Sequence, residues 1–191
     1  MHGSLPPPED LFREHAVLRR ILIVFDECAR ITRVGGRYDA RIVAHAAQIF
    51  ATFGAAYHAK SEERFIFPLF RVTDLAVVVE NLRREHAVAT QYVQRIAALA
   101  QQNNQPGLAE TMPAFTWLYR RHAAHEDIVV FANLRDIFST SRGFHELGER
   151  MEEFEHRTLG PDGFVVALEQ LAEIERPLGL DTATMYGRPP R

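Results

Sequence analysis

The sequence contains almost no cysteine and no long run of apolar residues. Cys28 is the single cysteine among 191 residues, which excludes an internal disulfide framework and a zinc or iron–sulfur site built from cysteines. A chain without disulfides is typical of a reducing compartment, so we expect a cytoplasmic protein. No apolar stretch approaches the roughly 20 residues of a membrane-spanning helix, so we expect no membrane partner.

The chain also lacks a strong excess of charge of one sign. Its 22 lysines and arginines face 25 aspartates and glutamates, which leaves a net charge of −3. This balance offers no basic surface, so we expect no nucleic-acid partner. The first residues, MHGSLPPPED, have neither a basic flank nor an apolar centre and therefore do not resemble a secretory signal.

Alternating patterns typical of strands are nearly absent, and helical periodicity recurs along the chain instead. Four long amphipathic helices are predicted, at about residues 9–32, 38–67, 73–101 and 108–138. Long helices joined by short loops are typical of an up-down-up-down four-helix bundle, so we predict an all-α fold. Pro68 is expected to kink or end the second helix, because proline lacks an N–H group and clashes with the preceding turn.

Two further helices are predicted near the end of the chain, at about 143–158 and 162–177. They are too short and too polar to form a core of their own, so we expect them to pack on the bundle. The prediction therefore divides the chain into four parts: a proline-rich leader at 1–8, the bundle at 9–138, a helical extension at 139–180 and a tail at 181–191.

Each of the four long helices places one histidine in its apolar stripe, out of nine histidines in the chain. Two of these histidines are followed by a glutamate four residues later, and positions i and i+4 share one face of a helix. A carboxylate in an apolar stripe is costly unless it is paired or bound to a metal. The six residues are His15, His58, Glu62, His86, His122 and Glu126.

Four imidazoles and two carboxylates that converge in a bundle core predict a site for two metal ions. The carboxylates can bridge the metals, and the histidines can supply two nitrogens to each, which leaves positions for an exogenous ligand. This donor set suits iron, manganese or zinc. Any one of the histidines alone would be interpreted as a hydrogen-bonded core residue. The repetition of the pattern, once per helix and in phase with the stripe, favours the metal site.

Similar spacings elsewhere in the chain are interpreted as surface features. The Glu-x-x-His spacing of ferritin-like sites occurs once, at Glu153 and His156, outside the predicted bundle. His145 and Glu149 repeat the His-x3-Glu spacing on the same polar helix, and we interpret both as part of a solvated face. The His-Glu-x-x-His motif of zinc proteases is absent from the sequence.

The segments around the six residues resemble the hemerythrin-like, or HHE cation-binding, domain family. They are residues 10–15 (DLFREH), 58–68 (HAKSEERFIFP), 84–86 (REH) and 122–127 (HAAHED). The resemblance covers about 9–138, and the stretch 154–180 is similar to the extension of bacterial single-domain members. It implies a non-heme di-iron centre, oxo- or hydroxo-bridged, with the six residues as iron ligands and Glu62 and Glu126 as bridges. Zinc or manganese is the alternative metal.

The chain departs from the oxygen-carrying members of that family at one position. Those proteins have a further histidine four residues after the third-helix histidine, and here that position is Thr90. The missing histidine opens a coordination position and argues against a pure reversible oxygen carrier. Asp127 follows Glu126 and remains open as a bridge, although helical phase favours Glu126. His125 shares a face with His122, and a role behind the ligands or toward solvent is favoured for it.

Three acidic or phenolic side chains near the predicted ligands have less defined roles. Glu63 follows Glu62 and faces away from it by about a quarter turn, so we expect it at the surface or behind a ligand. Tyr57 and Tyr119 could each donate a hydrogen bond, either to a metal-bound ligand or to a carboxylate behind a ligand. Simple packing is the default interpretation for both tyrosines.

The favoured function is a cytoplasmic di-iron protein that binds O2, NO or peroxide, in sensing, stress response or iron handling. The alternatives are a zinc- or single-metal-binding helical interaction module without redox activity, and a metal-free bundle with an adaptor role. The sequence shows ligands and open positions but no dedicated general base, which favours a ligand-binding protein over an enzyme. A monomer and a homodimer both remain open, and no redox partner is indicated.

Overall fold

The computed structural model describes residues 6–138 and 141–180, so most of the predicted leader and the predicted tail at 181–191 lie outside the described residues. In the described part every regular element is a helix, and no strand occurs, which confirms the predicted all-α class. None of these helices combines the length and the apolar character that a membrane span needs.

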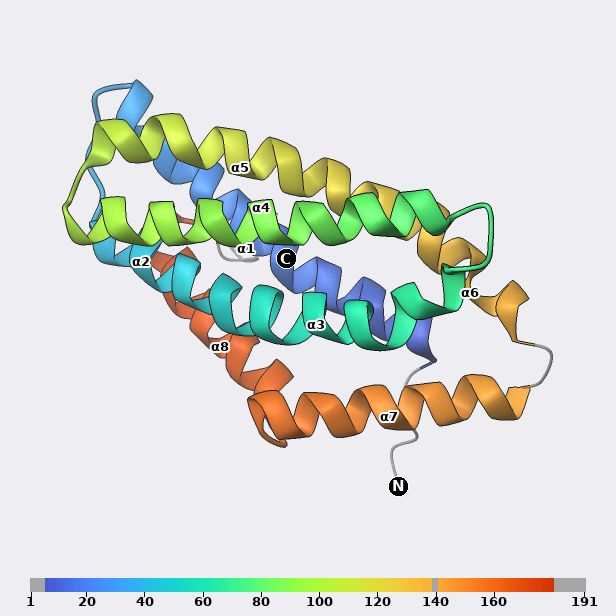
Figure 1. Ribbon diagram of the computed structural model, residues 1–191. Helices are drawn as coiled ribbons and strands as arrows, with labels where there is room; N and C mark the ends of the chain where they lie inside the picture. The colour runs from blue at the N-terminus through green and yellow to red at the C-terminus, as the bar shows by residue number, and fades with distance from the viewer. Residues whose placement is uncertain (1–5, 139–140, 181–191) are drawn as a thin grey trace, which may run out of the picture.

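Four helical rods form the bundle and alternate in direction along the chain (Figure 1). The first rod is α1 (Pro7–Arg33), and the third is α4 (Ala76–Gln101). The second rod consists of α2 (Ala40–Ile49), η1 (Phe50–His58), α3 (Ala59–Ser61), η2 (Glu62–Ile66) and η3 (Phe67–Phe70). The fourth rod consists of α5 (Gln105–His125), η4 (Glu126–Phe131) and α6 (Ala132–Ile137). Each rod contacts the next around the bundle, and the fourth contacts the first.

The rods begin and end where local chemistry predicts. Asp39 caps α2 by accepting a hydrogen bond from the backbone N–H of Arg41 at 2.9 Å, and Asn104 caps α5 by accepting one from Gly107 at 3.0 Å. This second cap places the start of the fourth rod at Gln105, slightly earlier than the periodicity indicates. The second rod closes in a short 3-10 turn at Phe67–Phe70, which contains Pro68, as expected from the lost N–H group.

The bundle core is divided into two apolar clusters along its length. The larger cluster includes Leu18, Phe50 and Phe115, and the smaller one includes Leu11, Phe70 and Val130. Along each rod, the predicted ligands lie between residues of the smaller cluster and residues of the larger one. The polar site therefore occupies the seam between two hydrophobic layers, with apolar packing on both sides of it.

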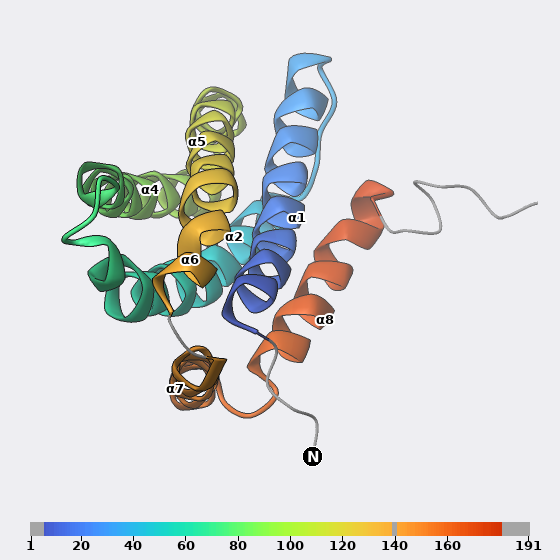
Figure 2. The same cartoon turned by 90° about the vertical axis from the view of Figure 1, so that its right-hand side faces the viewer.

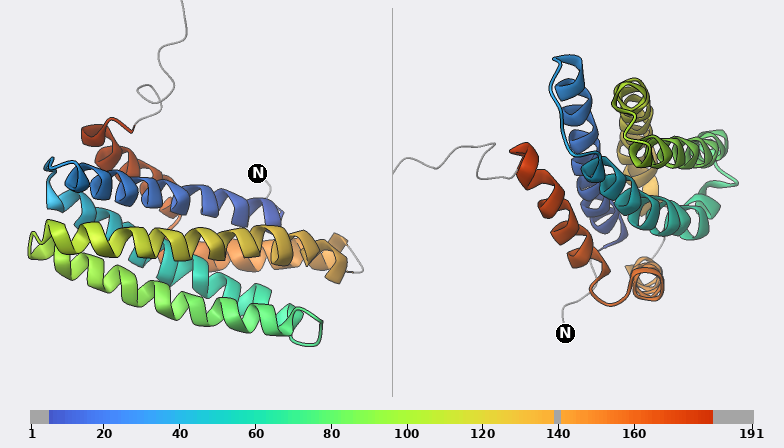
Figure 3. Two further views of the ribbon diagram at one scale, coloured as in Figure 1. Left: turned by 90° about the horizontal axis from the view of Figure 1, so that it is seen from above. Right: turned by 90° about the vertical axis from the view of Figure 1, so that its left-hand side faces the viewer.

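Two further helices, α7 (Ser141–Leu159) and α8 (Gly163–Glu175), lie on the outside of the bundle, followed by the short turn η5 (Arg176–Leu178). Figures 2 and 3 show α8 beside α1 and α7 below the second rod. Met151 of α7 enters the smaller apolar cluster, and Leu171 of α8 enters the larger one. Glu175 anchors α8 by accepting two hydrogen bonds from the Arg20 guanidinium, at 2.8 and 2.6 Å.

Candidate metal centre

The structure brings all six predicted ligands together in the seam of the bundle. Five of them are at most 1% exposed, and His86 is 5% exposed. Their donor atoms form two overlapping sets of four, and within each set the atoms lie within 4.8 Å of one another. One set contains His15 and His58, the other contains His86 and His122, and both sets include Glu62 and Glu126. The two glutamates are therefore shared between two adjacent groups of donors.

The histidines face the glutamates through their Nε2 atoms. Glu126 lies 3.1 Å from His122 and 3.3 Å from His15, measured from carboxylate oxygen to Nε2. Glu62 lies 3.3 Å from His86 and 3.5 Å from His58. Each glutamate thus contacts one histidine on its own rod and at least one on another rod. This arrangement places the carboxylates at the middle of the cluster and the imidazoles around them.

The backbone widens into π-helical turns where the two His-x3-Glu pairs lie. His58 is the last residue of η1, Glu62 is the first of η2, and Glu126 is the first of η4. π-helical turns are rare, and they are frequently found at functional sites. The hydrophobic periodicity of the sequence gives no indication of them, because an extra residue in one turn only shifts the phase of the stripe that follows.

The inward-facing atoms of the cluster have no hydrogen-bond partner. They are the Nε2 atoms of His15, His58, His86 and His122 and both carboxylate oxygens of Glu62 and Glu126. Buried polar atoms are nearly always paired, because an unpaired one keeps its full desolvation cost. Unpaired lone-pair donors around one small volume fit a pair of cations, which would satisfy nitrogens and carboxylates together.

A second ring of carboxylates supports the histidines from outside. Each histidine shares a hydrogen bond between its Nδ1 and an acidic residue of a different rod. The pairs are Glu14 with His58 at 2.5 Å, Glu63 with His86 at 3.1 Å, Glu85 with His122 at 3.0 Å and Asp127 with His15 at 2.7 Å. In each pair the acid of one rod supports the histidine of the next, so the ring closes around the bundle. A carboxylate on Nδ1 fixes the ring orientation and leaves Nε2 free for a metal.

The outer ring assigns positions to residues whose roles the sequence left open. Asp127 accepts from His15 and from the Arg19 guanidinium, so its carboxylate lies behind a histidine and not between the two donor sets. Glu63 lies behind His86, which was one of its two expected places. His125 is exposed and belongs to neither donor set.

Glu14 and Glu85 were missed by reasoning from the sequence. The available signal is that each directly precedes a predicted ligand, His15 or His86. Neighbouring residues on a helix point about 100° apart, so an acid next to an inward histidine faces the adjacent rod. An acid that supports a ligand histidine therefore lies next in sequence to a ligand of one helix but hydrogen-bonds the ligand of another helix.

The carboxylates control the protonation of three of the histidines. Burial works to lower the pKa of His15, yet its hydrogen bond to Asp127 and the nearby carboxylate of Glu126 outweigh burial and raise the pKa to about 9. The pKa values of His86 and His122 are also raised, because the nearby glutamates outweigh burial there too. Metal ions would have to displace these protons, so binding should strengthen as the pH rises.

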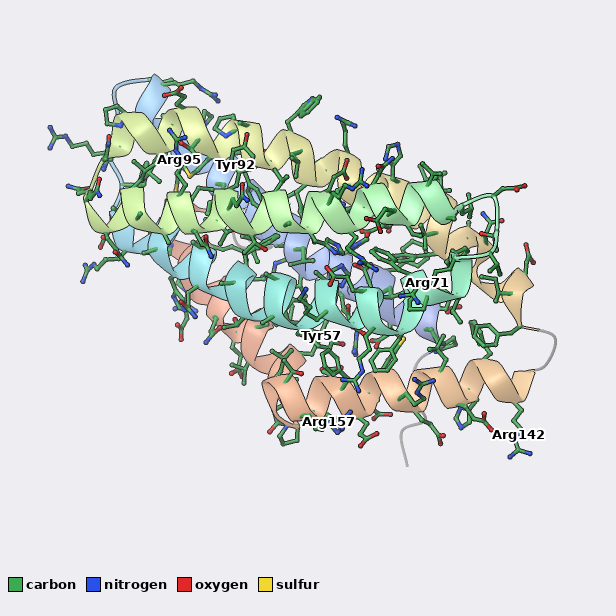
Figure 4. The ribbon with its side chains drawn as sticks, viewed as in Figure 1. Tyr57, Arg71, Tyr92, Arg95, Arg142 and Arg157 are labelled. Atoms are coloured by element: carbon green, nitrogen blue, oxygen red, sulfur yellow. The ribbon has the colours of Figure 1, made fainter. Side chains whose placement is uncertain are left out.

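The two tyrosines near the cluster have different environments. The Tyr57 hydroxyl donates a hydrogen bond to Glu14, on the side of the bundle that α7 covers (Figure 4). The Tyr119 hydroxyl is buried and has no hydrogen-bond partner in the described part of the chain. Its ring lies against the imidazole of His122, with 5.2 Å between ring centroids. Packing alone therefore describes neither tyrosine completely.

Comparison with known proteins yields one family and several relatives. The family model of the hemerythrin HHE cation-binding domain matches residues 7–134. One protein of Mycobacterium bovis and two of Mycobacterium tuberculosis strains, each described as uncharacterized, are 35% identical to the chain over 180 residues. The alignment covers 91% of this chain and 70% of each relative. No solved structure matches the chain.

Proposed function

The chain belongs to the hemerythrin HHE cation-binding domain family, and from this premise we propose that it is a non-heme di-iron protein that binds O2, NO or peroxide. The observation that carries the proposal is the set of inward-facing, unpaired donor atoms shared between two groups of buried residues. When bound, an iron pair supplies redox-active positions for a small ligand.

The residues divide the work of holding the metals. His15 and His58 would bind one iron, and His86 and His122 the other, with the carboxylates of Glu62 and Glu126 between them. The outer acids hold each imidazole with Nε2 pointing inward, which prepares the site before a metal arrives. The absence of a cysteine from the cluster favours iron over a structural zinc site.

We infer that a small cavity beside His86 is the route for the exogenous ligand. It has a volume of about 220 Å³ and lies between the second rod and α4. Ala55, Ala59 and Ala87 line it together with His86, the most exposed of the six predicted ligands. Thr90, at the position where oxygen carriers have a histidine, also lines this cavity and donates its hydroxyl to the carbonyl of His86 at 2.9 Å. Lys60, Glu63 and Arg83 complete the lining, so the cavity is small and partly charged.

Iron content tests the proposal most directly. The purified chain is reconstituted anaerobically with ferrous iron, and iron per chain is measured before and after oxidation, together with the visible spectrum. We expect two irons per wild-type chain and fewer than one in Glu126→Ala. Glu149→Ala is the matched control, because Glu149 follows His145 with the same spacing, 3.4 Å apart, but is exposed on α7. Fewer than one iron in the wild-type protein would contradict the proposal.

The same samples separate the proposed function from its alternatives. A chain that retains zinc, depends on zinc for stability and shows no iron spectrum would be a structural metal protein. For an iron-loaded chain, anaerobic titration of the reduced protein with O2, NO and peroxide distinguishes the roles. Reversible binding indicates a carrier or sensor, turnover indicates an enzyme, and loss of iron indicates an iron donor.

A further inference from the structure

Tyr119 lies on the inner face of α5, one helical turn before His122. Its side chain is 2% exposed, and its ring packs edge-on against Phe50, with 4.8 Å between ring centroids. Phe115 also packs against this ring, with 5.8 Å between ring centroids. The tyrosine is therefore part of the apolar layer that borders the donor cluster. Its ring contacts a ligand imidazole, and it also carries a hydroxyl group.

The hydroxyl of Tyr119 has no partner among the described residues. A buried O–H group that donates no hydrogen bond keeps its desolvation cost, so native structures rarely retain one without a partner. The phenol is therefore a hydrogen-bond donor without an acceptor, one helical turn from a ligand histidine.

Tyr57 provides the contrast within the same site. It too is buried beside a ligand histidine, but its hydroxyl is already engaged by Glu14, which in turn supports His58. The protein therefore uses one phenol to hold its own ligand set and leaves the other phenol free. The free donor borders the cluster at which an exogenous molecule would bind, and such a molecule can accept the hydrogen bond that no described residue accepts.

We propose that Tyr119 donates a hydrogen bond to the exogenous ligand of the metal pair. This inference rests on the proposed function, and it adds which ligands the site prefers. Small molecules that carry negative charge or a strong acceptor at the atom not bound to metal would be favoured, such as azide, peroxide or reduced NO. A hydrogen bond to a charged acceptor is stronger than one between neutral groups, so the preference favours anions.

Azide affinity tests the proposal. Iron-loaded, oxidised wild-type protein and Tyr119→Phe are titrated with azide, and binding is followed through the visible charge-transfer band. We expect azide to bind Tyr119→Phe roughly tenfold more weakly, the loss expected for one hydrogen bond to a charged acceptor. Tyr38→Phe is the matched control, since its buried hydroxyl also has no hydrogen-bond partner but lies outside the site, before α2. Equal affinities of wild-type protein and Tyr119→Phe would overturn the proposal.

A measurement on the wild-type protein keeps the proposal testable if Tyr119→Phe does not fold. The infrared stretch of bound azide is recorded in H2O and in D2O, and we expect a shift because the donor proton exchanges with deuterium. No shift in the wild-type adduct overturns the role of Tyr119. Iron-loaded wild-type protein that binds neither azide nor NO would instead contradict the proposed function, and iron content before azide addition distinguishes the two failures.

Discussion

The donor cluster has two halves, one with His15 and His58 and the other with His86 and His122. Both halves follow the same sequence pattern. The first and third rods each carry a Glu-His pair, at 14–15 and 85–86. The second and fourth rods each carry His-x3-Glu followed directly by a second acid, at 58–63 and 122–127. In both halves the histidines face the central glutamates, and each receives an outer acid on Nδ1. On the basis of pattern and hydrogen bonding alone, the halves are equivalent.

Their surroundings are different. Glu14, behind His58, is fully buried and receives a hydrogen bond from Tyr57. Glu85, behind His122, has a side chain that is 29% exposed. It lines a cavity of about 420 Å³ together with the exposed Arg121 and His125. We call the half with the buried Glu14–His58 pair closed and the half with the partly exposed Glu85–His122 pair open.

This difference in burial gives the two matching acid–histidine pairs, Glu14–His58 and Glu85–His122, different charge states. Burial raises the pKa of Glu14 to about 7 and lowers that of His58 to about 4, so this pair tends to be neutral. In the open half, the hydrogen bond from His122 lowers the pKa of Glu85. The pKa of His122 is raised, because Glu126 and Glu85 outweigh burial, so this pair tends to be charged.

The helical extension accounts for the asymmetry. Phe154 of α7 stacks on Tyr57 with 6.1 Å between ring centroids, and the nearby Glu155 adds a negative charge that raises the pKa of Glu14 further. Among the described elements, neither α7 nor α8 makes a substantial contact with α4 or α5. The comparison shows that the ligand pattern determines the geometry of the site, whereas burial under α7 determines whether an acid–histidine pair is neutral or charged.

The largest expected effect comes from weakening the packing of α7 on the bundle. Met151 of α7 is 1% exposed and fills the smaller apolar cluster. Met151→Ala should lower the free energy of unfolding by about 2–5 kcal/mol, measured by urea denaturation of the iron-free protein. Glu153→Ala, on the exposed face of the same helix, should change it by less than about 0.5 kcal/mol. Equal effects of the two variants would show that α7 is not part of the cooperative fold.

Removing the outer acids should separate the two halves. Glu14→Ala is expected to weaken metal binding by roughly 100-fold, and Glu85→Ala by roughly tenfold, the two ends of the range for acids behind metal-binding histidines. Water can replace Glu85 at the open half, but it does not readily reach the Nδ1 of buried His58. Competition with a chelator measures both affinities. The opposite order would refute the claim that burial distinguishes the halves.

The closed half should also make stability depend on pH. Burial raises the pKa of Asp10 from 3.8 to about 6. The folded chain therefore retains a proton that the unfolded chain releases between these values, and stability falls as the pH rises from 3.8 to 6. Asp10→Asn should raise the free energy of unfolding by about 1–2 kcal/mol at pH 7.

The control for this prediction is pH itself. Below pH 3.8 both states of the wild-type chain carry the proton on Asp10, so the stabilisation by Asp10→Asn should disappear there. Urea denaturation at pH 7 and below pH 4 measures the difference. A stabilisation that is equal at both pH values would arise from packing and not from the buried charge.

The smallest expected effect lies in the open half. Arg121 contributes to lowering the pKa of Glu85, but it is exposed, and solvent screens its charge. Arg121→Ala should therefore change metal affinity by no more than about fivefold, in the same chelator competition. A larger loss than that of Glu85→Ala would mean that solvent screening does not govern this half.

Much of the site could be predicted because its residues follow local rules. Spacing of four residues places His58 with Glu62 and His122 with Glu126 on one face of a helix, whatever the rest of the chain does. The apolar stripes indicate which face is buried, and this places His15 and His86 inside as well. The outer acids were less accessible, because Glu14 and Glu85 contact histidines of other rods, and such pairing depends on how the rods are rotated.

The sequence by itself determined an all-α chain with six inward-facing donors, because helical periodicity and the cost of burying a charge operate within single helices. Only the tertiary structure decided that the outer acids form a closed ring, that Tyr57 is engaged and Tyr119 free, and that one half is covered. Hydrogen bonding between rods and burial under α7 both depend on contacts between segments distant in the chain. A pattern that is symmetric in the sequence therefore becomes an asymmetric site.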